Sequence, residues 1–296
     1  MELRQLEYFV AVVETGSFSR AAKRCNITQP SLSQQIIKLE QELEQTLFDR
    51  LGRSIAITEV GKLFYPRAMS ILSDVQQAKH VITDGYNPEE RELAIGIIPT
   101  LAPYILSGAV ERFQVAYPTA SLQILEDTTN TLVDELLNAS LDVIFVSLPI
   151  NNKKIKTIEV FTEPLLVAVN NNNVLANVVT VNAESLSNLP FIRLTDPNCL
   201  ADQLDAFCYT QKIDPPVIYR TSNLTTTMEL VQSGLGVSLV PACSIPKSYT
   251  NLIFKQLDSN TANRVIVAAH HKGRSQSVLA QAFNHFLKES WESTIS

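Results

Sequence analysis

The order of helical patterns in the first 45 residues constrains the fold of this 296-residue chain more than any other feature. Apolar side chains recur at helical spacing from Leu3 onward and stop at Gly16, a residue type that commonly ends a helix. Ser17 can cap a second, short helix, and Thr28 can cap a third, in which Pro30 falls in the first turn, where its missing N–H costs nothing. The pattern predicts three short helices at the N-terminus.

The third predicted helix has two chemically distinct faces. Its apolar residues are spaced i, i+4, i+7 and i+11 from Leu32 to Leu43, which predicts a packed face. The opposite face is rich in amides and hydroxyls, which suits hydrogen bonds to base edges in a DNA major groove, although an ordinary solvated face fits this helix equally well. The base-edge candidates are Gln29, Ser33 and Gln34, with Pro30 and Ser31 setting up their helix.

A basic ribbon follows the third helix. Residues 54–58 alternate between apolar and polar side chains, and Arg50 and Arg53 lie at the turn before them. A ribbon with a basic tip is what a DNA-binding wing needs, since both arginines could reach phosphates and Arg53 could reach a minor groove. We place Lys38 of the third helix on the DNA backbone as well. The N-terminal region is therefore predicted to be an all-α winged helix-turn-helix domain.

Three short motifs punctuate these elements: Gln-Pro-Ser-Leu-Ser at 29–33, Leu-Phe-Asp-Arg at 47–50 and Thr-Glu-Val-Gly at 58–61. Together with the order of the helices, they closely resemble the signature of the LysR family of transcriptional regulators. The resemblance implies a regulator, and not an enzyme, that binds double-stranded promoter DNA and contacts RNA polymerase. It also implies homodimers and, as is usual in that family, homotetramers.

Charge and composition agree with a DNA-binding end on an acidic protein. The formal net charge is −6, yet residues 1–67 carry +1, so acid lies mostly in the remainder. The sequence has no apolar run of about 18 residues and no secretory-type start, so we expect a cytoplasmic protein with no membrane contact. The four cysteines and four histidines show no zinc spacing, and no phosphate loop or hydrolase triad is found. We expect no metal and no cofactor.

A long helical pattern begins after Thr58. Its apolar residues follow a four-three alternation for nearly three heptads, which predicts a seam for a second copy of the chain, with packing on the chain's own sensor region as the alternative. Pro66 inside the pattern predicts a bend or an irregular turn. Turn-forming and acidic residues at 84–90 place a hinge there. We therefore divide the chain into a DNA-binding domain at 1–58, a connecting helix and hinge at 59–88, and a sensor domain at 89–296.

The sensor half alternates short apolar runs with helical patterns, which is typical of an α/β domain with a mostly parallel sheet. Strands are expected near 93–98, 122–125, 141–146, 165–169, 191–194, 217–220, 237–240 and 265–269. The last strand and a final helix are expected to return to the first lobe. The fold class is thus a two-lobed α/β sensor, like periplasmic solute-binding proteins, with a ligand cleft between lobes. Lobe I is expected at about 89–162 and 267–296, and lobe II at about 163–266.

Two threonines follow the first two predicted strands of the sensor. Thr100 and Thr129 each stand where a helix should start, so that backbone N–H groups and a hydroxyl can hold an anion or a small polar molecule. Each could instead be only a helix cap, which is the commoner role for a single such residue. Two of them facing one cleft favour a binding site.

Cys199 and Cys208 lie in one predicted short helix. Cys199 falls in its first turn, where the backbone dipole favours the thiolate, whereas Cys208 shares a face with apolar core residues. Nine helical positions separate the two Cα atoms by about 13 Å, at about 1.5 Å per residue, while a disulfide tolerates about 7 Å at most. A disulfide therefore requires refolding of the segment, which oxidation of Cys199 to a sulfenic acid could trigger.

The sensor half resembles one branch of the LysR family more specifically. Ile97-Ile98-Pro99-Thr100, Pro103-Tyr104, Cys199-Leu200, Asp202-Gln203 and Phe207-Cys208 are similar to OxyR, the peroxide-sensing branch, and the resemblance runs through essentially the whole chain. It implies that Cys199 is the peroxidatic cysteine and Cys208 the resolving one. By the same resemblance, Thr100, Thr129 and Asp202 would belong to the peroxide pocket.

The sequence departs from the OxyR pattern beside the reactive cysteine. Asn198 stands where the pattern has a histidine and Ala201 where it has an arginine, and a further arginine is replaced around His271. Loss of cationic neighbours should weaken stabilisation of a thiolate.

Three functions stay open on the sequence. The first is a regulator that responds to hydrogen peroxide by thiol–disulfide switching. The second is a LysR-type regulator that binds a small organic anion near Thr100 and Thr129, with both cysteines structural. The third is a thiol peroxidase, because a helix-start cysteine with a resolving partner is also peroxidase chemistry, although the N-terminal domain argues against it.

Overall fold

A computed structural model describes residues 1–51, 54–83, 92–195, 199–245, 251–258 and 262–295. The chain divides into two compact units, one made mainly of Met1–Asn87 and the other mainly of Pro88–Leu136 and Leu141–Ser296. Each unit has its own core. The predicted hinge at 84–90 lies outside the described residues.

The N-terminal unit begins with the three predicted helices, α1 (Leu3–Thr15), α2 (Phe18–Arg24) and α3 (Gln29–Leu43). The backbone of Gly16 is left-handed, with φ of 61°, and ends α1. The Ser17 and Thr28 hydroxyls accept hydrogen bonds from backbone N–H groups at the starts of α2 and α3. The predicted caps are therefore confirmed, and they fix the turn between α2 and α3.

A two-stranded ribbon completes this fold. β1 (Phe48–Leu51) pairs antiparallel with β2 (Ser54–Ile57), and the Glu40 carboxylate of α3 accepts from the backbone N–H groups of Leu47 and Phe48 at 2.7 and 3.2 Å. The Phe9 ring lies 5.4 Å from that of Phe48, which ties the ribbon to the helical core. This ribbon is the predicted wing. Residue Arg53 and the side chain of Arg50 lie outside the part of the chain that the structure describes.

The connecting helix α4 (Glu59–Thr83) is continuous through Pro66, where a bend or irregular turn was predicted. Thr58 begins it, because its hydroxyl accepts from the Gly61 N–H at 3.0 Å. The first part of its apolar stripe packs inside its own unit, with Ala68 fully buried and Phe64 and Ile71 against the same core. The stripe is therefore only partly available to a second copy.

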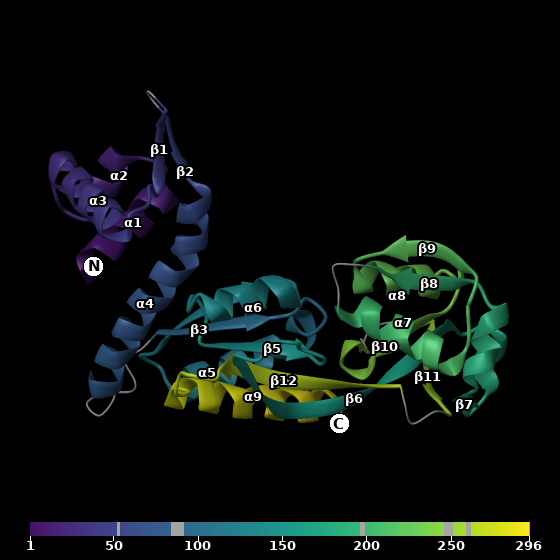
Figure 1. Ribbon diagram of the computed structural model, residues 1–296. Helices are drawn as coiled ribbons and strands as arrows, with labels where there is room; N and C mark the ends of the chain where they lie inside the picture. The colour runs from purple at the N-terminus through teal and green to yellow at the C-terminus, as the bar shows by residue number, and fades with distance from the viewer. Residues whose placement is uncertain (52–53, 84–91, 196–198, 246–250, 259–261, 296) are drawn as a thin grey trace. The chain divides into compact units, whose positions relative to one another are not determined.

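The C-terminal unit is built on an eight-stranded sheet that passes through two lobes, in the order β4-β3-β5-β12-β6-β11-β7, with β10 also paired to β6. In lobe I, β3 (Glu92–Ile97), β4 (Ser121–Glu126) and β5 (Val143–Ser147) are parallel, and β12 (Asn263–His271) is antiparallel to β5. The helices of lobe I are η2, a π-helix (Ala102–Leu106), α5 (Ser107–Ala116), α6 (Thr129–Leu137) and α9 (Val278–Ile295). Figure 1 shows α6 on one face of this sheet and α5 and α9 on the other.

The two lobes share their longest strand. β6 (Ile155–Asn170) pairs with β12 along its first half and with β10 (Ser238–Pro241) and β11 (Leu252–Leu257) along its second half. Figure 1 shows β6 and β12 running side by side toward lobe II. The predicted lobe boundaries, 162/163 and 266/267, therefore fall inside strands. The strand predicted at 165–169 is the second half of β6.

Lobe II contains the remaining elements. A short parallel pair, β8 (Phe191–Leu194) with β9 (Val217–Thr221), lies beside α7 (Cys199–Gln211) and α8 (Leu224–Gln232). The smaller elements are η3 (Val174–Asn177), β7 (Thr180–Val181), η4 (Ala183–Asn188) and η5 (Ala242–Ser244). The lobe has an apolar core that includes Leu200, Leu204 and Phe207 of α7. None of the described helices is both long and apolar enough to cross a membrane.

Candidate functional site

Helix α3 offers a polar surface on the N-terminal unit. Leu32, Ile36 and Leu39 are fully buried, which confirms the predicted packed face. The base-edge and backbone candidates lie on the other side: Gln29, Pro30, Ser31, Gln34 and Lys38 are exposed, and Ser33 is half-buried. The Ser31 hydroxyl is 2.8 Å from that of Thr28 and so belongs to the cap. Among the described contacts, the side chains of Gln29, Ser33, Gln34 and Lys38 have no such capping role.

A buried ion pair lies where the two lobes of the C-terminal unit meet. Arg264 of β12 and Glu163 of β6 have completely buried side chains, and Nε of Arg264 donates to Oε1 of Glu163 at 2.6 Å. The Oε2 atom of Glu163 accepts from the backbone N–H of Cys243 in η5 at 2.7 Å. A buried charge is tolerated only with a partner and saturated hydrogen bonds, and both ions have them.

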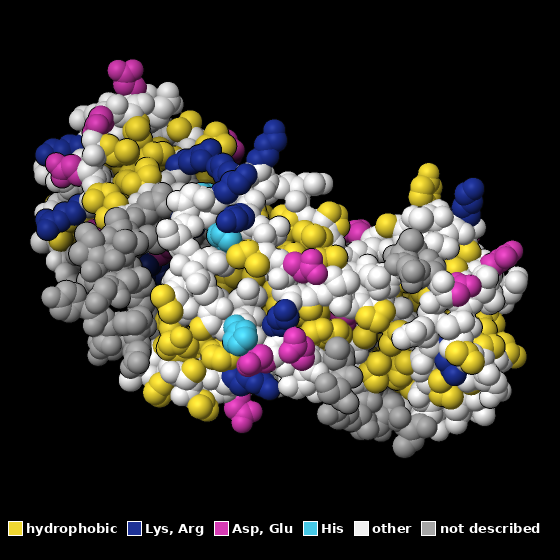
Figure 2. All heavy atoms as spheres, turned by 90° about the horizontal axis from the view of Figure 1, so that it is seen from below, with side chains coloured by type: hydrophobic (Ala, Val, Ile, Leu, Met, Phe, Trp, Pro, Cys, Tyr) yellow, Lys and Arg dark blue, Asp and Glu magenta, His cyan; other side chains and the backbone are white. Residues whose placement is uncertain are grey.

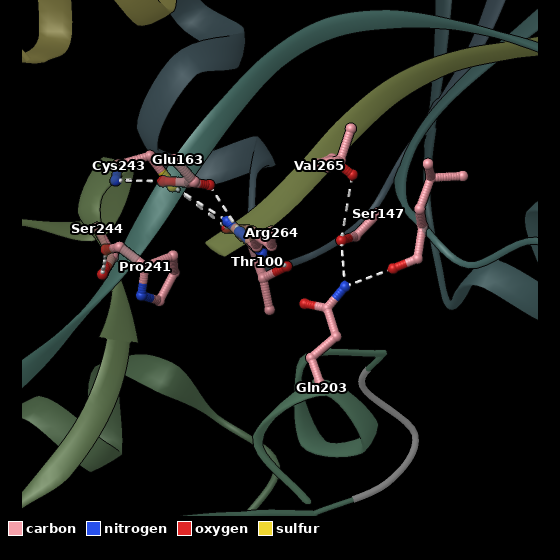
Figure 3. A network of polar contacts seen from close by, with 10 residues as sticks. Thr100, Ser147, Glu163, Gln203, Pro241, Cys243, Ser244, Arg264 and Val265 are labelled. Atoms are coloured by element: carbon pink, nitrogen blue, oxygen red, sulfur yellow. Dashed lines mark hydrogen bonds and ion pairs between the residues drawn. The ribbon is translucent and has the colours of Figure 1, made fainter. Parts of the chain in front are cut away.

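The guanidinium of Arg264 also holds Thr100, the residue predicted at the first strand end (Figure 3). Nη1 donates to the Thr100 hydroxyl at 2.9 Å and Nη2 donates to its carbonyl oxygen at 3.1 Å. Because the hydroxyl oxygen accepts from a cation, its own proton is turned away from Arg264 and is available for donation. Thr100 is thus a buried, polarised donor at the end of β3 rather than a helix cap.

Cys243 completes this network. Its Sγ atom accepts from Nη2 of Arg264 at 3.3 Å and lies 3.7 Å from the carbonyl oxygen of Thr100, to which its thiol donates. Burial raises the pKa of the Cys243 thiol to about 12, even though the charge of Arg264 acts in the opposite direction. Cys243 is therefore a neutral thiol in the core of the site.

The other predicted pocket residues lie apart from this network. Thr129 is half-buried at the start of α6, and its hydroxyl is buried without a hydrogen-bond partner among the described residues. The neighbouring Thr128 performs the capping, since its hydroxyl accepts from the Thr131 N–H at 3.4 Å. Asp202 is exposed in the first turn of α7. The described contacts thus bring Thr100, but neither Thr129 nor Asp202, to Arg264.

The cysteine-bearing segment is helical as predicted. Cys199 is the first residue of α7, and its side chain lies outside the described part of the chain, as does residue Asn198. Cys208 is a free, half-buried thiol packed against the lobe II core. Burial raises the pKa of Cys208, and Arg193 only partly offsets this. Nine helical positions again separate the two cysteines by about 13 Å.

One side chain fastens α7 to lobe I. The amide nitrogen of Gln203 donates to the Ser147 hydroxyl at 2.5 Å and to the Leu148 carbonyl oxygen at 2.6 Å, and the Ser147 hydroxyl donates to the Val265 carbonyl oxygen at 3.4 Å (Figure 3). Gln203 lies between the two cysteines in the helix. A cavity of about 240 Å³ adjoins it, lined by Gln203, Phe207, Thr210 and Arg264 among others.

Arg264 and Glu163 are not among the site residues predicted from the sequence. An arginine of the pocket was predicted to be lost around His271, but Arg264 supplies a guanidinium at Thr100. The available signal was a charged residue directly before the apolar run Val265–Ala269, a position where a charge is unusual if the strand is buried. The described residues contain no group of His, Cys, Asp and Glu side chains able to hold a metal ion.

Comparisons with known proteins agree with both units. Residues 3–62 match the bacterial regulatory helix-turn-helix protein, lysR family, and residues 87–292 match the LysR substrate binding domain. The chain belongs to the LysR family of transcriptional regulators. Its relatives are regulators and not enzymes, which removes the thiol peroxidase from consideration.

Individual relatives of this LysR regulator include both OxyR proteins and an operon-specific activator. The transcriptional dual regulator OxyR of Escherichia coli K12 is 32% identical over 246 residues, which cover 83% of this chain and 81% of OxyR. The Hca operon transcriptional activator HcaR of the same organism is 30% identical, with 94% and 95% covered. A full-length OxyR variant from Pseudomonas aeruginosa has a TM-score of 0.78 at 25% identity, with 99% and 95% covered.

Proposed function

We propose that this LysR-family regulator senses hydrogen peroxide through Cys199 and Cys208. The observation that carries the proposal is the polarised Thr100 hydroxyl, held by a buried guanidinium in the same sensor whose helix α7 bears both cysteines. The similarity to OxyR supports it. Arg264, although it is paired with Glu163, keeps a guanidinium at Thr100.

The chemistry needs a nucleophile and a proton donor. The Cys199 thiolate would attack one peroxide oxygen, the O–O bond would break, and the second oxygen would leave as hydroxide, which becomes water on protonation. The Thr100 proton can stabilise the negative charge that develops on the leaving oxygen. The Cys208 thiolate would then attack the sulfenic sulfur and form a disulfide, with release of a second hydroxide that is protonated to water.

The fold explains how such a reaction would become a conformational signal. The two cysteines stand about 13 Å apart in α7, so the disulfide cannot form until the helix unwinds. Cys208 is packed in the lobe II core and its raised pKa disfavours the thiolate while the helix is intact. Oxidation would therefore rebuild the segment that Gln203 ties to lobe I.

Thiol chemistry tests this function. Cys199 should react with hydrogen peroxide far faster than free cysteine, and mass spectrometry should find a Cys199–Cys208 disulfide. Cys208→Ser should stop the reaction at the sulfenic acid, while Cys25→Ser serves as the control. Ordinary reactivity of Cys199, or no such disulfide in the wild type, would refute peroxide sensing.

A small organic anion is the second candidate input. The cavity of about 240 Å³ lined by Gln203 and Arg264 favours it. In that case both cysteines are structural, and the Cys199→Ser, Cys208→Ser double variant should respond to the effector like the wild type. Loss of that response would argue for the thiol mechanism.

The output would be promoter DNA read by α3. Gln29, Ser33 and Gln34 are the proposed base-edge residues, with Lys38, Arg50 and Arg53 on the backbone or minor groove. We place DNA binding at 1–58, the connecting helix and hinge at 59–88 and sensing at 89–296, with RNA polymerase as partner.

Arg53→Ala should lower the slope of the log–log salt dependence of DNA binding by about one. An unchanged slope would remove Arg53 from the DNA.

A further inference from the structure

Four lysines gather at one end of the lobe I sheet, and we call them the lysine end: Lys153, Lys154, Lys156 and Lys272. The start of β6 and the end of β12 lie side by side, with Ile155 opposite His271. The Lys272 N–H donates to the Lys154 carbonyl oxygen at 2.7 Å, which joins the two connecting segments. The lysines are therefore held together by backbone pairing and not by chance proximity of long side chains.

The lysine end is basic on a protein whose net charge is −6. All four side chains are exposed, and no ion pair links them to the described acidic residues. The sequence has no Asp or Glu between Asp142 and Glu159, nor between Asp258 and Glu289. Figure 2 shows Lys and Arg side chains gathered beside a histidine on the face it presents. This concentration of like charge is unfavourable unless an anion offsets it.

The positive potential of the lysine end affects the ionisable side chains around it. The pKa of His270, the strand partner of Lys156, is lowered by burial first and then by the charges of Lys156 and His271. The acidic residues on the adjoining strand starts are Glu92 and Asp142, and the Asp142 carboxylate accepts from the Ala94 N–H at 2.9 Å. These two carboxylates carry less negative charge than the four lysines carry positive charge, and two histidines lie beside the lysines.

This end of the sheet is remote from the cleft. β5 runs from Val143 to Ser147, and Ser147 lies at the Gln203 and Val265 contacts. β12 is antiparallel to β5, so its last residue, His271, lies where β5 begins. β3 is parallel to β5 and also begins at this end of the sheet. The lysine end therefore belongs to a surface other than the effector site.

We propose that the lysine end binds the phosphate backbone of duplex DNA, outside the bases that α3 reads. Lysines are compact point charges without the planar fork that reads bases, so the contact should be independent of sequence and sensitive to salt. DNA is also the polyanion already held by the same chain, so the second contact is intramolecular and benefits from high effective concentration. Because residues 1–67 carry a net charge of only +1, phosphate contacts from the lysine end would add to the affinity of the chain for DNA.

Two triple variants with the same net charge test the proposal. Lys154→Gln, Lys156→Gln, Lys272→Gln removes the lysine end, and Lys212→Gln, Lys255→Gln, Lys288→Gln removes three lysines elsewhere on the sensor. The affinity of the full chain for a duplex of arbitrary sequence and about 60 base pairs, long enough to extend beyond the site of one dimer, is measured by fluorescence anisotropy from low to moderate salt. The first triple should flatten the log–log slope by about 1 to 3, and the second should leave it unchanged.

Lysine acetylation footprinting gives a second measurement that does not depend on affinity. The same duplex should protect Lys154, Lys156 and Lys272 in the wild-type protein and leave Lys212, Lys255 and Lys288 reactive. Equal salt slopes for the two triples, or equal protection of both sets, would overturn the proposal and point to an acidic protein surface instead. If the wild type did not bind this duplex of arbitrary sequence, the sequence-independent contact proposed for the lysine end would be refuted, whereas the proposed reading of promoter bases by α3 would not.

Discussion

Arg264 organises the inter-lobe site at the scale of single residues. Its guanidinium contacts the carboxylate of Glu163, the hydroxyl and carbonyl of Thr100, and the thiol of Cys243, so four chemical groups from three separate segments depend on one side chain. Because both Arg264 and Glu163 are fully buried, neither can be rescued by solvent when the other is removed. The pair therefore matters for stability as well as for orienting Thr100.

Glu163→Ala should destabilise the sensor by about 3 to 5 kcal/mol, because it leaves a buried cation without a partner. Urea unfolding can be followed by the fluorescence of Trp291, the only tryptophan of the chain, which stacks on Phe161 of β6 at 4.5 Å. The matched control is Glu159→Ala, an exposed position on the same strand, which should change stability by less than about 0.5 kcal/mol. Equal effects of the two variants would contradict the argument.

Cys243 should be inert in the folded protein. With a pKa of about 12, its thiolate fraction at pH 8 is on the order of 10⁻⁴, and its side chain is buried as well. Iodoacetamide at pH 8 should therefore label Cys243 only after unfolding in urea, when its pKa falls toward the ordinary value. Labelling at the same rate in native and unfolded protein, read by mass spectrometry, would show that the thiol is accessible.

At the scale of elements, α7 is the part of the C-terminal unit that the proposed thiol–disulfide switch would rearrange. It carries both cysteines and is joined to lobe I through the Gln203 amide. Net contributions of about 0.5 to 1.5 kcal/mol for each such hydrogen bond would favour the helical, reduced state. The same bonds would have to break if the helix refolded to form the proposed disulfide.

Gln203→Leu should therefore make the Cys199–Cys208 disulfide easier to form, by about tenfold in the equilibrium constant or about 30 mV toward more negative potential. Equilibration in glutathione buffers measures this. Thr210→Val is the control, because its hydroxyl donates only to the Ala206 carbonyl oxygen of its own helix, at 2.8 Å. If both variants shift the potential equally, the effect comes from helix stability and not from the contact with lobe I.

The sequence predicted elements whose signals are local and failed where the deciding partner is distant. The caps Ser17 and Thr28 and the strand at 191–194 follow from neighbouring residues. The continuity of β6 does not, because Pro164 reads as a strand breaker. In the structure Pro164 lies where β6 changes partners from Asn263 to Pro241, so its missing N–H interrupts little.

The candidate site shows the same limit. Thr100 was found because a polar residue after a strand is a local signal, whereas the partner of Arg264 is Glu163, 101 positions earlier. Pairing across such a separation exists only after the sheet has formed. No periodicity or motif near Arg264 or Glu163 indicates that the two residues pair.

At the scale of the whole molecule, two exposed sheet edges should support self-association. Ile124 on the edge strand β4 and Val115 on α5 are 42% and 79% exposed, and Ile218 and Tyr219 of β9 are 47% and 44% exposed. Exposed apolar side chains on the edge strands of a sheet indicate interfaces.

Ile124→Lys should therefore weaken assembly of the full chain by about tenfold or more, or about 1.4 kcal/mol, because a charge replaces an apolar contact at the edge. Sedimentation equilibrium measures the change. Val179→Lys, at a position 90% exposed in lobe II, is the control and should assemble like the wild type. Unchanged assembly of the Ile124 variant would exclude β4 from the interface.

The shared strands also determine the order in which the sensor can fold during synthesis. The chain leaves lobe I along β6, builds lobe II, and returns along β12 to α9, whose Phe283 packs on Phe113 and Phe145. Lobe II is therefore complete on the ribosome before lobe I, although lobe I begins first. The early strands β3, β4 and β5 have to wait, with an exposed apolar face, until nearly the last residue has been translated. A translational pause after β12 would prolong that exposure and is the point at which a chaperone has most to protect.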